Sequence, residues 1–190
     1  MKKIYCLLIL TACIIYSSCR EEYKEELYRH YVSFKAPLNY WGVTRINVRY
    51  KREGKVTYEL PLIVSGSTAN NKNIEVHVGI DSDTLRVLNY EQFQDRKDLH
   101  YREMDASFFS FPETVPIPSG ENSSVMPIDF SLESIDLSDK WILPLTILDH
   151  ASYNYVAHPR KHYRKALLYV EPFNDYSGIR SEEHTSELQS

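Results

Sequence analysis

The chain has 190 residues, a formal net charge of -4 and 15 tyrosines but only 6 glycines. Acidic and basic residues are scattered along it, which argues against a nucleic acid partner. Two of the three cysteines fall within the first 13 residues, so the rest of the chain cannot form a disulfide and has to fold around a packed core.

The N-terminal segment has the layout of a secretory signal peptide. Two lysines precede an apolar run from Ile4 to Tyr16, which is too short to span a membrane. Two serines then precede Cys19, and this order resembles a bacterial lipobox, although Tyr16 stands where leucine is usual. We expect residues 1–18 to be a lipoprotein signal peptide and Cys19 to be lipidated. The alternative is ordinary signal cleavage beside an unmodified cysteine.

Residues 19–30 are expected to form a lipidated tether. Its first charges, in the sequence REE after Cys19, resemble the surface-export signal of lipoproteins in the Bacteroidota. A lipidated cysteine carries enough acyl chains for stable anchoring. The sequence therefore predicts an outer-membrane lipoprotein on the cell surface, with the membrane as a partner through the lipid.

Alternating apolar and polar residues predict half-buried β-strands in the body of the chain. These runs are INVRY (46–50), VTYELPLIV (56–64), IEVHVGI (74–80) and MPIDFSLE (126–133). Two further runs, WILPLTIL (141–148) and ALLYV (166–170), are apolar on both faces, as central strands are. Pro61, Pro127 and Pro144 cannot donate to a ladder, so we expect them at edges, bulges or strand ends.

One segment departs from this alternation. DTLRVLNYEQF, which starts at Asp83, predicts a short helix with Asp83 as its cap. The predicted fold is an all-β, antiparallel, immunoglobulin-like β-sandwich with one short helical crossover, over residues 31–172.

A longer stretch, FFSFPETVPIPSGENSSVMPIDFSLESIDLSDKWILPLTI, resembles a domain of unknown function at the N-termini of Bacteroidota surface lipoproteins. The residues that match its last strand are Leu137, Asp139, Lys140, Leu143, Pro144, Leu145 and Ile147, with Trp141 in place of a tyrosine. The resemblance implies a downstream lectin-like, carbohydrate-binding or family-18 glycosidase domain. It also implies a glycan and other surface glycan-uptake proteins as partners.

The C-terminal end contains two short segments of different character. Residues 173–179 resemble the start of a linker to a missing downstream domain. Residues 180–190, RSEEHTSELQS, resemble a translated sequencing adapter, and we expect them to be an artefact. The alternative is a disordered polar tail.

Motifs for catalysis are absent from the sequence. It has no glycine-rich phosphate loop, no G-x-S-x-G elbow and no D-x-x-D-x-D-x-E run of a family-18 glycosidase. The acids of DSD at 81–83 follow a strand and are interpreted as a turn and helix cap. We therefore expect this fragment to be non-catalytic and to need no cofactor. His150, His158 and His162 suggest a metal site, but a cationic loop is the preferred interpretation.

Aromatic residues in predicted loops are the candidates for contact with a glycan, because sugar rings stack their C–H faces on aromatic planes. These residues are Tyr40, Trp41, Tyr153 and Tyr155, with Asn39 and Asn154 as polar neighbours. The alternative is that the tyrosines pack against the ends of the sandwich. Trp141 lies in an apolar strand and is expected in the core.

The sequence thus predicts a cell-surface lipoprotein module that binds glycans or acts as a spacer in a glycan-utilisation protein. Two alternatives stay open. The chain is the N-terminal accessory domain of a truncated family-18 endoglycosidase, or it is a structural, adhesin- or fimbria-like component.

Overall fold

The computed structural model describes residues 28–51 and 53–174. The strands are β1 (Tyr31–Phe34), β2 (Val43–Arg49), β3 (Val56–Ser65), β4 (Ile74–Ile80), β5 (Arg102–Glu103), β6 (Phe109–Ser110), β7 (Thr114–Ile117), β8 (Ser123–Phe130), β9 (Trp141–Ile147) and β10 (Lys165–Phe173). The helices are α2 (Ser82–Phe93), the 3-10 helix η1 (Lys97–Leu99) and α3 (Lys161–Arg164). None of the described helices has the length and apolar character needed to cross a membrane.

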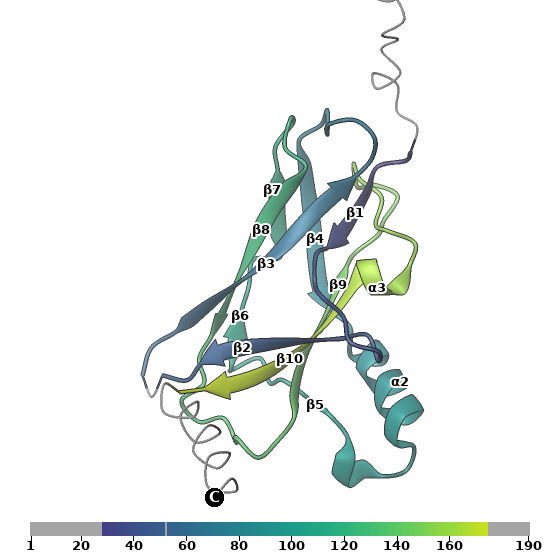
Figure 1. Cartoon of the computed structure of the whole chain (residues 1–190). Coiled ribbons are helices and arrows are strands. Elements are labelled where there is room, and N and C mark those ends of the chain that lie inside the picture. Colours follow the sequence, from purple (N-terminus) through teal and green to yellow (C-terminus); the bar gives the residue numbers. More distant parts are fainter. Residues whose placement is uncertain (1–27, 52, 175–190) are drawn as a thin grey trace, which may run out of the picture.

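Two sheets pack face to face and confirm the predicted all-β sandwich (Figure 1). The first sheet has the order β1-β3-β8-β6, and the second has the order β2-β10-β9-β4-β7 with β5 also beside β9. The prediction of an antiparallel arrangement needs one correction. β2 is parallel to β10 and β5 is parallel to β9, so the second sheet is mixed.

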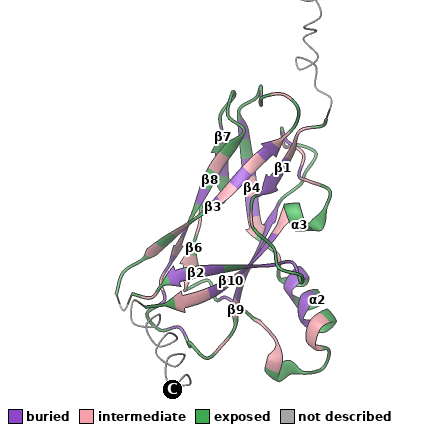
Figure 2. Cartoon of the chain, viewed as in Figure 1, coloured by how far each residue is buried: buried purple, intermediate pink, exposed green. Residues whose placement is uncertain are grey.

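The core lies between the two sheets, where the alternating strands point their apolar residues (Figure 2). Leu60, Leu62 and Phe130 of the first sheet are fully buried, as is Leu145 of the second. The predicted inward alternation fails at Ile80, which is 42% exposed. Ile80 is the last residue of β4, where the chain leaves the sheet to enter α2.

Helix α2 explains why β9 and β10 are apolar on both faces. It packs Leu85 and Leu88 against Val43, Ile142 and Leu167 on the face of the second sheet that points away from the core. Figure 1 shows α2 beside β10 and outside the sandwich. The expected helical crossover is therefore present, and it connects β4 to β5, which both border β9.

Pro61, Pro127 and Pro144 lie in strands that have a neighbouring strand on each side. At each proline, however, one of the two neighbours has already ended. The backbone N–H of Lys35, just past the end of β1, donates to the carbonyl of Pro61 at 2.9 Å. That of Asp81, just past β4, donates to Pro144 at 3.0 Å. The N and C=O of one strand residue point the same way. The nitrogens of Pro61 and Pro144 therefore point past the ends of β1 and β4, where no ladder bond is lost. Pro127 is not reached by β6, which pairs only with the last two residues of β8.

The sequence predicts Asp83 as the cap of α2, but the cap is Asp81. Its carboxylate accepts hydrogen bonds from Thr84 N at 3.2 Å and Thr84 Oγ1 at 2.8 Å, and it forms an ion pair with Lys165 Nζ at 2.6 Å. Burial alone raises the pKa of Asp81, but the bonds from Lys165 and Thr84 outweigh it and hold the pKa below its ordinary value. Asp83 lies in the first turn, where it pairs with Arg86.

Replacing Asp81 with asparagine should make folding stability less sensitive to acid. Because the folded-state pKa is the lower one, the charged carboxylate stabilises the fold above its unfolded-state pKa, and this contribution disappears as the pH falls through the folded-state value. Urea unfolding from neutral to acidic pH should therefore show a shallower loss of unfolding free energy in Asp81→Asn than in the wild type. Asp83→Asn, which keeps the cap, is the control. Equal pH slopes for wild type and Asp81→Asn would contradict the role given to this carboxylate.

Candidate functional site

The four aromatic residues predicted to contact a glycan line two separate hollows. Tyr40 and Trp41 line one of about 300 Å³, between the turn that holds them, helix α2 and the α3 segment. We call it the Tyr40–Trp41 hollow. Tyr153 and Tyr155 line a second one of about 550 Å³ between the sheets, where β3 ends and β4 begins. We call this the sandwich-end hollow. Both volumes fall in the range of small-molecule sites.

Asn39 fixes the turn that presents Tyr40 and Trp41. Its Oδ1 accepts hydrogen bonds from Trp41 N at 2.9 Å and Val43 N at 3.0 Å. The turn is closed by Gly42 N donating to Asn39 O at 3.0 Å. An asparagine that bonds its own backbone two residues on is a common way to rigidify a turn. The predicted role of Asn39 as a sugar-binding neighbour is therefore limited, because its carbonyl oxygen already holds the turn.

Gly42 is required at the end of this turn. Its φ is +78°, in the left-handed region, and a Cβ there would meet His162 Cε1 at 2.8 Å. Any other residue would strain the backbone and displace the imidazole. The turn and the α3 segment therefore approach closely at this point, and their contact forms one wall of the hollow.

Both aromatic rings of the turn are accessible. Tyr40 is 92% exposed and Trp41 is 44% exposed, and the rings meet edge to face with centroids 5.2 Å apart. Leu88 and Leu167 are the apolar residues that line the hollow beside them. The polar side chains around the hollow are Thr84, Glu91, Lys161, His162 and Lys165.

The charges of this hollow differ in how they are compensated. Lys165 Nζ bonds Asp81 and also Thr84 Oγ1, the latter at 2.6 Å, so its charge is compensated at the N-terminus of α2. Glu91 and Lys161 are exposed and form no ion pair with another described residue. An exposed acid and an exposed base beside two rings can donate to and accept from hydroxyl groups.

Tyr155 is mainly a structural residue. It is 7% exposed and belongs to the core, and its hydroxyl donates to Leu148 O at 2.8 Å and accepts from His77 N at 3.0 Å. Burial raises the pKa of Tyr155 to about 12. Tyr155 therefore packs against the sandwich, which was the alternative interpretation of this residue. It lines the sandwich-end hollow, but its hydroxyl already bonds the backbone.

Tyr153 is half-buried and stacks on His77, with centroids 4.1 Å apart and planes 7° from parallel. Tyr155 lies beside it, 5.4 Å away and 15° from parallel. Asn154 Nδ2 donates to Asn73 O at 2.6 Å, so part of the amide predicted to bind a sugar ties two loops together instead.

Trp141 begins β9 and packs against the core without being fully buried. Its indole N–H donates to Asp136 O at 2.8 Å, and its ring meets Phe108 edge to face at 5.8 Å. Trp141 was expected in the core, and it packs against the core while remaining partly exposed. The hydrogen bond to Asp136 fixes the orientation of its indole.

The three histidines considered as metal ligands do not come together. The ring of His158 contacts those of Tyr31, with centroids 5.2 Å apart, and Tyr163, with centroids 4.5 Å apart, whereas His162 packs on Gly42. Within residues 28–51 and 53–174, no group of three or more His, Cys, Asp or Glu side chains is placed to hold a metal ion. The cationic segment forms the one-turn helix α3 and not the loop expected from Pro159.

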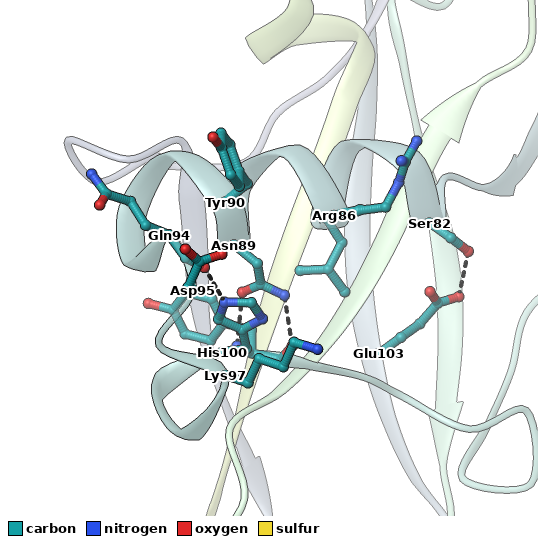
Figure 3. A pocket seen from close by; sticks show the side chains of 11 residues that line it. Ser82, Arg86, Asn89, Tyr90, Gln94, Asp95, Lys97, His100 and Glu103 are labelled. Carbon is teal, nitrogen blue, oxygen red and sulfur yellow. Dashed lines mark hydrogen bonds between the residues drawn. The ribbon is translucent and has the colours of Figure 1, made fainter.

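A third hollow, of about 380 Å³, was not predicted from the sequence (Figure 3). It lies between α2, η1 and β5, and many of its polar groups already bond one another. Ser82 Oγ donates to Glu103 at 2.7 Å, and His100 Nε2 lies 2.9 Å from Gln94 O. The Asn89 amide forms two hydrogen bonds with the backbone of Tyr101, at 2.9 and 2.8 Å. These bonds hold η1 against the helix, and no sequence pattern signals them.

The predicted lipidation site lies outside the described residues. This applies to Cys19, to the predicted signal peptide 1–18 and to residues 19–27 of the predicted tether. It applies equally to residues 175–190, which include the adapter-like segment.

Three solved structures similar to this chain come from Bacteroides. A structural-genomics protein of unknown function from Bacteroides ovatus is 53% identical, with a TM-score of 0.69, and the match covers 78% of this chain and 48% of that one. A multidomain B. ovatus protein that includes DUF1735 is 52% identical, with a TM-score of 0.68, covering 78% of this chain and 47% of that one. An auxiliary nutrient binding protein from Bacteroides thetaiotaomicron is 44% identical, with a TM-score of 0.66, covering 80% of this chain and 50% of that one.

The chain thus spans about half the length of these solved relatives. No curated protein matches it. The family described as "Domain of unknown function (DUF4973)" matches residues 23–151, which is most of the described sandwich. The chain belongs to this DUF4973 family.

Proposed function

We propose that this chain is a glycan-binding accessory module held at the cell surface, and that the Tyr40–Trp41 hollow takes a sugar ring. The proposal assigns no catalytic step to the chain. The observation that carries it is the exposed ring pair on a turn that Asn39 and Gly42 hold rigid. A rigid platform binds with little loss of conformational entropy, because its rings are already in place.

The surroundings of the pair suit a sugar. An apolar C–H face of the ring would stack on Trp41 or Tyr40, and the hydroxyls at its edge would reach Glu91 and Lys161. The 44% identical relative described as an auxiliary nutrient binding protein supports a binding role over a catalytic one.

Surface location is the second part of the proposal. It depends on the lipobox-like residues before Cys19 and on the charges that follow. A tether from Cys19 to the start of β1 at Tyr31 would hold the sandwich outside the membrane.

A glycan array with the purified protein tests the binding role. We expect saturable binding to at least one glycan, and a loss of about 30-fold or more in the Tyr40→Ala/Trp41→Ala variant, since truncating a central contact costs about 2 kcal/mol. Tyr90→Ala is the matched control, because Tyr90 is 68% exposed on α2 but lies in the third hollow. No binding to any glycan by a folded protein would contradict the proposal and favour a spacer or adhesin-like role.

A further inference from the structure

The sandwich-end hollow has a different chemical character from the Tyr40–Trp41 hollow. Its apolar lining comes from Val32, Val64 and Ile74, which are core residues at the ends of β1, β3 and β4. Its polar lining contains two cations, Arg29 and Lys72. Among the described residues that line it, none is an aspartate or a glutamate.

The two cations are uncompensated within the described part of the chain. Lys72 is exposed and makes no ion pair there. Arg29 lies over the ring of Tyr31, with its guanidinium carbon 5.9 Å from the centroid, and makes no ion pair with another described residue. A hollow lined by two cations that have no acidic partner among the described residues attracts an anionic group.

The wall that carries Lys72 is rigid. Asn70 is 2% exposed, and its Nδ2 donates to Lys72 O at 2.7 Å and Pro118 O at 3.1 Å, while its Oδ1 accepts from Lys72 N at 3.0 Å. The lining residues Tyr153 and Asn154 are also fixed, since Tyr153 stacks on His77 and Asn154 is tied to Asn73, the residue after Lys72. The hollow is therefore formed before any ligand arrives.

We propose that the sandwich-end hollow binds a sugar that carries a carboxylate, such as a uronic or sialic acid residue. The carboxylate bonds Lys72 and Arg29. The C–H face of the ring lies on the apolar lining beside Tyr153, and hydroxyls reach the exposed amide of Asn71. A bare phosphate would use the cations but would leave the apolar lining unfilled.

The inference goes beyond the proposed function, because it names a second site with its own ligand chemistry. D-glucuronate and N-acetylneuraminate, each compared with its neutral methyl ester, are the probes. Amide shifts in NMR titrations of the purified protein report where each probe binds. We expect saturable shifts at Asn71 and Tyr153 with at least one acid. The affinity for its methyl ester should be lower by a factor of about ten or more.

Variants separate this site from the other hollow. Lys72→Gln should weaken binding of the acid about tenfold. Lys55→Gln, which changes an exposed lysine outside the hollow, should leave it unchanged. Tyr40→Ala/Trp41→Ala should also leave it unchanged. Equal affinity for acid and ester, no effect of Lys72→Gln, or no saturable shift with either acid would overturn the inference. None of these results would affect glycan binding at the Tyr40–Trp41 hollow.

Discussion

Replacing Phe130 with alanine should lower the free energy of unfolding by about 3–5 kcal/mol, the usual cost of removing a buried phenylalanine. Phe130 ends β8, is 0% exposed and lies opposite Val56 of β3 and Phe109 of β6. Its loss would leave a cavity where three strands of the first sheet meet. Since domains have about 5–15 kcal/mol of stability in total, the variant should be close to unfolding.

Urea denaturation measures this effect directly. Val125→Ala is the matched control on the same strand, because Val125 is 46% exposed and points to solvent. We expect the control to change stability by no more than about 0.5 kcal/mol. A loss below about 1 kcal/mol in Phe130→Ala would show that the two sheets do not pack as described.

Replacing Cys19 with serine should release the protein from the membrane and abolish its labelling with palmitate. Each buried methylene of an acyl chain contributes about 0.8 kcal/mol to membrane binding, so loss of the whole lipid should change the distribution almost completely. Fractionation of cells that express the full chain, with wild type alongside, gives the measurement.

Cys13→Ser is the matched control, because Cys13 lies in the apolar run of the predicted signal peptide. This variant should stay in the membrane fraction and keep its label. If Cys19→Ser stays labelled and membrane-bound, the protein is held by another means and the proposed anchor is wrong.

The strand pattern could be predicted from the sequence because a two-residue period follows directly from the geometry of a half-buried strand. Runs such as VTYELPLIV and IEVHVGI therefore became β3 and β4 with the expected inward residues, except at Ile80. The parallel pairing of β2 with β10 was not predictable in this way. It joins residues more than 100 positions apart in the chain, and alternation within each strand carries no information about its partner.

The helix cap shows a similar limit. Both Asp81 and Asp83 could cap a helix by residue type. In the fold Asp81 is the one that bonds Thr84 and also pairs with Lys165, a residue more than 80 positions later in the chain. The same holds for the candidate sites. Tyr40, Trp41, Tyr153 and Tyr155 were all predicted to lie in loops, but their separation into two hollows depends on contacts with α2, α3 and β4.

The placement of Lys72 and Arg29 was not suggested by any motif. They lie 43 positions apart, one just before β1 and one between β3 and β4, and the sandwich brings them to one hollow. To predict this site one would have to know that β1 pairs with β3, and no local sequence pattern indicates that pairing.

The two tryptophans of the chain offer the most direct test of sugar binding at the exposed turn. Each gives one indole N–H signal in a nitrogen-15 correlation spectrum, and Trp41→Phe assigns them. Titration with a glycan that binds on the array should move the Trp41 signal in proportion to occupancy. The Trp141 signal, held by its bond to Asp136, should stay in place. A glycan that saturates the protein while the Trp41 signal does not move would contradict the account.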